Sequence, residues 1–133
     1  MLTVNVYMVR DLLCPLGGSA DDDVKILQYE NTDGNNEAEI KNIITKIIKP
    51  YFDKQTEIYK ASSKRSLSYF LTTNRMDFGD IFDSCLIAFD HPTDARDFFL
   101  WIWEILFPDE SYHLDEIKKY TEIEDINECN SYS

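Results

Sequence analysis

The histidines and cysteines of this chain are the residues best suited to bind a metal or act as a nucleophile, and their spacing fits neither role. His91 and His113 lack the HxH or HExxH spacing of a zinc site. Cys14, Cys85 and Cys129 form no CxxC pair, and three cysteines give no disulfide framework. The sequence therefore predicts reduced thiols and no metal site.

Two short acidic segments have the lettering of a metal site without its spacing. Residues 31–35 read Asn-Thr-Asp-Gly-Asn, but an EF-hand has its glycine at the sixth place and a glutamate at the twelfth, here Asn42. Residues 39–41 read Glu-Ile-Lys, like some metal-dependent nucleases, but their surrounding pattern is typical of a helix, whereas those enzymes use a strand. The sequence also lacks P-loop, GxGxxG and GxSxG motifs. We expect no cofactor. A pocket that brings a carboxylate pair together with His91 or His113 would favour an enzyme.

Charge is distributed unevenly along the sequence. The net charge is −4 in residues 1–35, +4 in residues 36–75 and −12 in residues 76–133, and the whole chain carries −12. The last segment holds fifteen acidic residues against three basic ones. A field of this kind repels nucleic acid and membranes and attracts basic proteins. We therefore expect a basic protein partner and no direct binding to nucleic acid or membranes.

The acidic and aromatic side chains of residues 76–133 are the candidates for contact with this partner. Three of the acids recur every third residue, and the helix expected to end near residue 107 contains both tryptophans and is apolar on almost all sides. Complementary charge speeds encounter and selects a partner, and aromatic residues are frequent interface anchors. The candidate set is Asp77, Asp80, Asp83, Asp94, Asp97, Trp101, Trp103, Asp109, Glu110, Tyr112, Asp115 and Glu116.

Each of these features also has a simpler interpretation. The acidic face can serve only to keep the protein in solution. A C-terminal helix with Leu114, Ile117 and Tyr120 can cover the second apolar face of the tryptophan-containing helix. The basic segment can be a solvated helix face with local salt bridges, or it can dock against the acidic segment of a second copy. The sequence leaves these alternatives open.

In size, acidity and sorted charge, the chain resembles the small immunity proteins that bacteria pair with secreted toxins. The resemblance implies a cytoplasmic protein without catalytic activity that neutralises a basic, nuclease-type toxin by covering or blocking it. One alternative is an inhibitor of a restriction or CRISPR-type nuclease that mimics nucleic acid, which needs a long regular row of carboxylates. The others are a small enzyme and an adaptor subunit, which could be a homodimer.

Length and composition predict one globular domain, 1–133, with a frayed end at residues 128–133. The hydrophobic fraction of 44% and the aromatic fraction of 14% are enough for a core. No apolar run reaches the ~18 residues of a membrane span, and the first residues lack a signal-peptide pattern. These features predict a cytoplasmic protein.

The hydrophobic pattern predicts the elements that would position the candidate residues. Alternating or continuous apolar runs predict strands at residues 2–9, 24–30, 66–73 and 84–90. Helical spacing predicts a helix over residues 37–59, either kinked at Pro50 or divided there into two short helices, and further helices at 90–107 and 111–120. Loops or turns are expected at 14–23, 31–36 and 74–83. The order β-β-α-β-β-α-α predicts an α+β two-layer sandwich. Its mostly antiparallel sheet of about four strands has helices on one face and is loosely similar to the ferredoxin-like arrangement.

Overall fold

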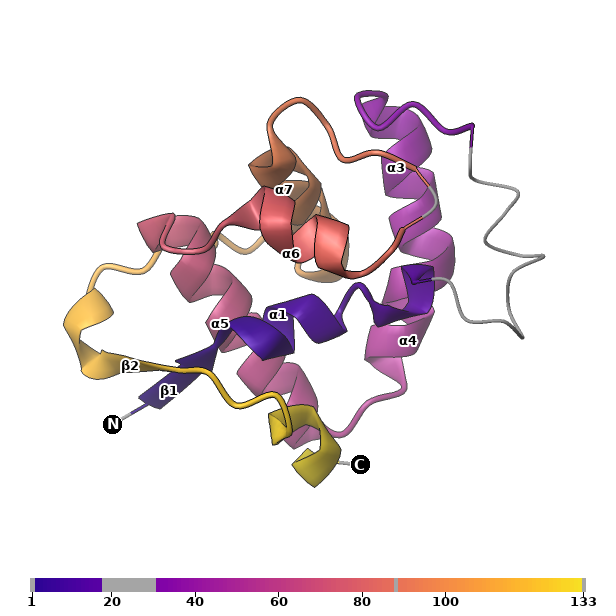
Figure 1. Ribbon diagram of the computed structural model, residues 1–133. Helices are drawn as coiled ribbons and strands as arrows, with labels where there is room; N and C mark the ends of the chain where they lie inside the picture. Colours follow the sequence, from indigo (N-terminus) through magenta and orange to yellow (C-terminus); the bar gives the residue numbers. More distant parts are fainter. Residues whose placement is uncertain (1, 18–30, 88, 133) are drawn as a thin grey trace.

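A computed structural model of the protein describes residues 2–17, 31–87 and 89–132 (Figure 1). In chain order, the elements are β1 (Leu2–Asn5), α1 (Val6–Asp11), the 3₁₀ helix η1 (Cys14–Leu16), α3 (Glu37–Ile43), the π-helix η2 (Ile44–Ile48), α4 (Lys49–Asp53), α5 (Glu57–Thr73), α6 (Phe78–Ser84), α7 (Ala95–Leu106), the 3₁₀ helix η3 (Ile117–Lys119), β2 (Tyr120–Ile123) and the 3₁₀ helix η4 (Glu128–Tyr132). The long helix α5 packs against α1, β1 and α7. The described chain is therefore mainly helical.

The one sheet in the described ranges consists of two short parallel strands. β1 pairs with β2 from Leu2 opposite Tyr120 to Asn5 opposite Ile123. The predicted α+β sandwich, with its mostly antiparallel sheet of about four strands, is therefore wrong. The pairing joins the first and last parts of the chain, and local periodicity carries no information about such a contact.

The predicted strand at residues 66–73 is the second half of α5. Residues 66–71 are all buried, so this part of the helix has no polar face that would reveal a period of 3.6. Its serines are small enough for β1 to approach closely, and the Asn5 N–H donates to the Ser66 hydroxyl at 3.0 Å. Periodicity alone does not separate a buried helix from a buried strand in so short a run.

The other predicted strands are also different in the structure. Only the first half of residues 2–9 is a strand, because the Asn5 side chain accepts a hydrogen bond from the Tyr7 N–H at 3.1 Å and caps α1. The predicted strand at 84–90 begins inside α6, and none of its described residues belongs to a strand. The predicted strand at 24–30 lies outside the described residues.

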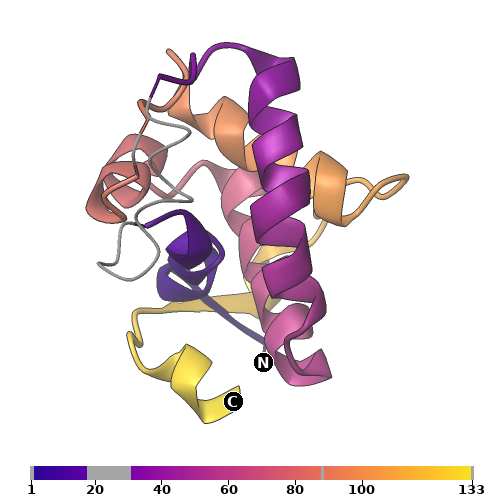
Figure 2. The ribbon, with the colours of Figure 1, turned by 90° about the vertical axis from the view of Figure 1, so that its right-hand side faces the viewer.

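The first predicted long helix is divided differently from the expectation. Figure 2 shows α3, η2 and α4 as one continuous column. Pro50, which has no N–H to donate, follows directly after the wider π-helical turn, in which the Lys49 N–H donates to the Ile44 carbonyl. The chain therefore remains helical through the proline, and the predicted continuation to residue 59 lies in α5 instead.

Capping residues set the boundaries of the later helices. Asp94 accepts a hydrogen bond from the Arg96 N–H at 3.1 Å, so α7 begins after the predicted start at residue 90. Asp77 caps α6 inside the segment expected to be a loop or a short helical turn. The helix expected at residues 111–120 is wrong, because this segment contains irregular chain, η3 and the first residue of β2.

A buried carboxylate holds the C-terminal end, where residues 128–133 are expected to be frayed and the described part forms η4. Glu128 accepts hydrogen bonds from Asn5 Nδ2 at 2.8 Å, the Ser62 hydroxyl at 2.6 Å and the Tyr132 hydroxyl at 2.7 Å. Burial alone would raise the pKa of Glu128, but these donors outweigh burial and lower the pKa below its ordinary value. This network joins the two ends of the chain on one side of the molecule (Figure 1).

Candidate functional site: an acidic groove

The candidate acids lie in separate places and do not form one continuous patch. Asp94 and Asp97 lie at the N-terminal end of α7, whereas Asp109 and Glu110 follow its C-terminal end. A helix of 12 residues is about 18 Å long at 1.5 Å per residue. The two pairs are therefore separated by the length of α7.

Some of the later candidate acids are matched by basic side chains of the same chain. Lys64 Nζ lies 2.7 Å from a carboxylate oxygen of Glu110. His113 Nε2 lies 3.5 Å from Asp115, and Lys119 lines the same hollow as Asp115 and Glu116. This part of the candidate set therefore mixes positive and negative groups.

The aromatic candidates are largely used inside the protein. Trp103 is 4% exposed and donates from Nε1 to the Glu110 carbonyl at 2.8 Å. Trp101 is half-buried against the core, and the half-buried Tyr112 hydroxyl accepts a hydrogen bond from Arg96 Nη2 at 3.2 Å. On the second apolar face of α7, Trp103 and Phe107 are buried, whereas Leu100 and Trp101 are half-buried. Trp103 is a core residue and not an exposed partner anchor.

Two of the candidate acids line the same pocket as two acids outside the candidate set. Asp77 and Asp80 lie at the start of α6, while Glu122 lies in β2 and Glu124 follows it. These four side chains line one pocket of about 250 Å³. Arg75 also lines it, so four carboxylates and one guanidinium give the pocket a formal charge of −3.

The floor of this pocket is apolar. Phe70 is 3% exposed and Met76 is 7% exposed, so both belong to the core. The apolar lining residues are Val6, Phe70, Met76, Ile81 and Ile123. A pocket with an apolar floor and charged edges matches a long side chain that has an apolar stem and a charged end.

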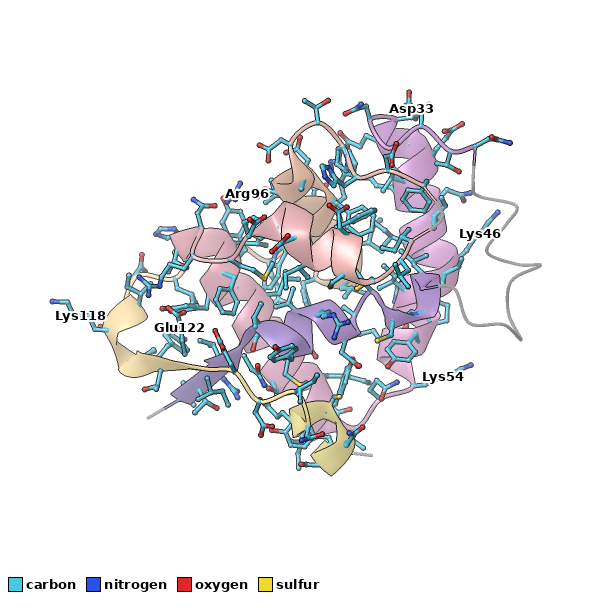
Figure 3. All side chains as sticks on the ribbon, in the orientation of Figure 1. Asp33, Lys46, Lys54, Arg96, Lys118 and Glu122 are labelled. Carbon is cyan, nitrogen blue, oxygen red and sulfur yellow. The ribbon has the colours of Figure 1, made fainter. Side chains whose placement is uncertain are left out.

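Glu122 lines the pocket from β2, and Figure 3 labels its side chain. Tyr120 and Glu122 lie on the same side of the strand because side chains alternate. The rings of Tyr120 and Tyr69 are 5.9 Å apart, and the Tyr69 hydroxyl donates to Glu122 Oε2 at 2.7 Å. Burial and then the neighbouring Glu122 raise the pKa of Tyr69. Arg75 Nε also donates to Glu122, so this carboxylate is fixed in place.

The other three carboxylates of the pocket are exposed and have no cation of their own. Asp77 Oδ1 accepts a hydrogen bond from the Asp80 N–H at 3.0 Å, which caps α6. Within the described ranges, no ion pair involves Asp77, Asp80 or Glu124. Their negative charge therefore remains available to an external group.

A second hollow, of about 340 Å³, adjoins the pocket along α6. Asp80 and Ile81 line both. In the second hollow, Arg10 Nε donates to the Ser84 hydroxyl at 3.0 Å, and Ile126 is 59% exposed. We refer to the pocket and this hollow together as the acidic groove. It combines the negative pocket with a mixed continuation, in which Arg10 and Ser84 lie beside Ile81 and Ile126.

Another cluster of polar side chains serves the fold. The hydroxyls of Tyr51 and Tyr59 both donate to Asp11 Oδ2, the first at 3.0 Å, and the Cys14 thiol donates to Oδ1 at 3.4 Å. Cys14 is exposed as a residue, but the partial burial of its thiol and the charge of Asp11 raise the pKa of Cys14 to about 12. Burial and Asp11 raise the pKa of both tyrosines as well. A thiol with a raised pKa is a poor nucleophile. The hydrogen bonds of this cluster join α1 to α4 and α5.

Sequence reasoning missed Arg75, Glu122 and Glu124 as groove residues. The letters Tyr-Thr-Glu-Ile at residues 120–123 alternate in the way that is typical of a strand, and this signal could have placed Glu122. The helix expected at 111–120 concealed it. The proximity of these residues to α6 depends on tertiary packing and has no local signal.

The structure was searched for metal-binding groups and membrane-spanning helices among residues 2–17, 31–87 and 89–132. No three His, Cys, Asp or Glu side chains there are grouped closely enough to hold a metal ion. None of the helices there has the length and apolar character needed to cross a bilayer. Comparison with known protein families, with curated proteins and with solved structures found no match. The acidic groove is therefore interpreted from its own geometry.

Proposed function

We propose that this protein is a small acidic inhibitor that binds a basic protein, in the manner of an immunity protein that neutralises a nuclease-type toxin. The observation that carries the proposal is the acidic groove, in which four carboxylates and one guanidinium line a pocket with an apolar floor. Negative charge selects and orients a basic surface, and apolar contact then slows dissociation.

Inhibition follows from the nature of the surface that such a protein covers. A net charge of −12 attracts a basic partner, and at physiological salt this attraction extends over about 8 Å. A nuclease uses its own basic surface to hold the phosphates of its substrate. An acidic protein bound on that surface excludes the nucleic acid, so it needs no catalytic group.

The arrangement of the acids gives less support to a nucleic-acid mimic. Duplex DNA carries about one charge per 1.7 Å of its axis, so a mimic needs a long regular row of carboxylates. Here the candidate acids form separate groups, with Asp94 and Asp109 at opposite ends of α7. The acidic groove is a local feature and does not have the form of such a row.

A small enzyme and a self-docking dimer are also less well supported. Neither His91 nor His113 lines the acidic groove, so no imidazole accompanies its carboxylates. Lys41, Lys49 and Lys64 form ion pairs within one copy, which reduces the charge available to attract a second copy.

The proposal is tested by affinity capture of the tagged protein from an extract of its native host at low salt. A high-salt wash then releases proteins held by charge, and mass spectrometry identifies them. We expect a basic protein whose enzymatic activity the purified chain inhibits. Capture of no basic protein, or of one whose activity the chain leaves unchanged, contradicts the proposal.

Two variants with the same change in net charge locate the binding surface. The groove variant neutralises three acids of the acidic groove without changing side-chain shape: Asp77→Asn, Asp80→Asn and Glu124→Gln. The distal variant does the same away from the groove: Asp94→Asn, Asp97→Asn and Asp109→Asn. Each raises the net charge from −12 to −9, and asparagine retains the helix caps of Asp77 and Asp94. Capture by the distal variant but not by the groove variant assigns the partner to the groove.

A further inference from the structure

We propose that the pocket between α6 and β2 binds one arginine side chain of the protein partner, in exchange for the chain's own Arg75. The inference rests on the proposed function, because it names the chemical group that the acidic groove recognises. It follows from the size of the pocket, its lining, and the guanidinium that already lies at its edge.

The pocket has the size for one side chain. Its volume of about 250 Å³ lies below the roughly 300–1,000 Å³ of sites for drug-sized ligands. The apolar floor, which includes Phe70 and Ile81, can take the methylene stem of a long basic residue. An inserted side chain of this kind buries apolar surface while its charged end stays among the carboxylates.

The negative charge of the pocket favours a cation with several hydrogen-bond donors. Asp77, Asp80 and Glu124 are distributed around the pocket and are not grouped closely enough to hold a metal ion. A guanidinium is planar and carries five N–H donors, so it can bridge two carboxylates, whereas a lysine ammonium acts as a point charge. The distribution of the acids therefore favours arginine over lysine.

Arg75 shows that a guanidinium fits at this edge of the pocket. Arg75 Nε donates to Glu122, and the two side chains are 63% and 33% exposed. An exposed ion pair of this kind contributes little to stability. A partner arginine can therefore replace Arg75, and Glu122 then joins the other three carboxylates around the incoming guanidinium.

The exchange predicts competition between Arg75 and the ligand. Removal of Arg75 makes the formal charge of the pocket more negative, from −3 to −4, and leaves Glu122 without its ion-pair partner. Arg75→Gln keeps a side chain of similar length without the charge. We therefore expect Arg75→Gln to strengthen arginine binding, although it removes an ion pair from the folded protein.

The experiment is an NMR titration of the ¹⁵N-labelled full chain with N-acetyl-arginine amide. N-acetyl-citrulline amide, which has the same shape without the charge, and N-acetyl-lysine amide are the control probes. We expect arginine to shift the amide signals of Met76, Ile81 and Ile123, with lysine weaker and citrulline without effect. Equal responses to arginine and citrulline, or shifts confined to other parts of the chain, would overturn the proposal.

Two variants make the titration specific. We expect Arg75→Gln to bind arginine several-fold more tightly, and the groove variant to bind it at least tenfold more weakly. The distal variant should match the wild type. The remaining amide signals report whether each variant keeps its fold. If Arg75→Gln binds arginine no better than the wild type, the exchange with Arg75 is wrong.

The two proposals fail in distinguishable ways. If the wild-type chain captures and inhibits a basic partner through the groove but its groove signals do not respond to arginine, the proposed function holds and the arginine pocket is wrong. If the chain binds arginine in the groove but captures no basic protein, the arginine pocket holds and the proposed function is wrong.

Discussion

Two regions of the molecule use charge in opposite ways. One is the side formed by α3, η2, α4 and α5, which we call the helical side, and the other is the acidic groove. On the helical side, Lys41 lies 2.7 Å from both Glu37 and Glu104, and Lys64 lies 2.7 Å from Glu110. In the groove, Arg75 pairs with Glu122, and no ion pair involves Asp77, Asp80 or Glu124 within the described ranges. The net charge of a sequence segment therefore differs from the unpaired charge on the corresponding surface, because acids from distant segments neutralise part of the basic segment.

The comparison extends to carboxylates that serve only the fold. Asp11 accepts hydrogen bonds from two tyrosines, and Glu128 from three side chains. The groove carboxylates of Asp80 and Glu124 have no such donors within the described ranges. Figure 3 shows Lys46 and Lys54 pointing outward on the side of the molecule opposite Glu122. The chain thus gives its structural acids hydrogen-bond donors, whereas Asp80 and Glu124 of the groove have none within the described ranges.

The largest effect on stability is expected at Asp11. Asp11→Ala leaves the Tyr51 and Tyr59 hydroxyls without their acceptor, and we expect the free energy of unfolding to fall by about 2–4 kcal/mol. Urea denaturation measures the change. Asp80→Ala, in the groove, is the matched control and should change it by less than about 0.5 kcal/mol. Similar losses in both variants would remove the distinction between the two kinds of carboxylate.

A smaller, pH-dependent effect is expected at Glu128. Its pKa is lowered in the folded state, so its contribution to stability is present above the ordinary glutamate pKa and is lost as pH falls through the lowered value. Glu128→Gln should cost about 1–2 kcal/mol at neutral pH and flatten the fall of stability in acid. Denaturation at several pH values tests this, and Tyr132→Phe, which removes one donor, should give an intermediate profile. Parallel wild-type and Glu128→Gln profiles would contradict the role of this network.

The groove variant should keep or gain stability, in contrast to Asp11→Ala. Like charges that line one pocket repel each other, so neutralising three of them at low salt should leave the free energy of unfolding unchanged or raise it by up to about 1 kcal/mol. The gain should disappear near 1 M salt, where the Debye length is about 3 Å. Thermal unfolding at two salt concentrations measures it. Clear destabilisation at low salt would show that these acids support the fold.

The smallest effect is expected for the ion pairs of the helical side. Lys41→Met removes both contacts of this lysine, but the partner carboxylates of Glu37 and Glu104 are more than half exposed. Exposed pairs contribute about 0.2–1 kcal/mol, so we expect a loss of about 0.5 kcal/mol in urea denaturation. A loss above about 2 kcal/mol would mean that these pairs are structural, as Asp11 is.

Sequence periodicity predicted the helices with a clear apolar pattern and failed where burial or long-range pairing determined the structure. The apolar stripe that starts near residue 37 and the region around Trp103 are helical as predicted. The apolar run at 66–73 predicts a strand, which is wrong, because the burial of residues 66–71 removes the helical period. The two apolar faces of its helix predict Trp103 as an anchor, but the structure buries this side chain in the core.

The candidate site was predicted in part for the same reasons. Asp77 and Asp80 were selected from their spacing, and both line the groove. Glu122 and Glu124 complete it only because β2 pairs with β1 and lies close to α6 in the folded chain. Asp94 and Asp109 are acids of the same segment, but the length of α7 separates them. Sequence spacing indicates which acids lie on the same helical turn, but it does not indicate which segments of the chain lie side by side after folding.

The most direct test of the groove is the dissociation constant of the captured basic partner for three forms of the chain. Isothermal titration calorimetry at low salt compares the wild type with the groove and distal variants, which have the same net charge. We expect the groove variant to bind about 100-fold more weakly, which corresponds to about 2.7 kcal/mol, and the distal variant to remain within about threefold of the wild type. Equal weakening in both variants would show that total charge, and not the acidic groove, holds the partner.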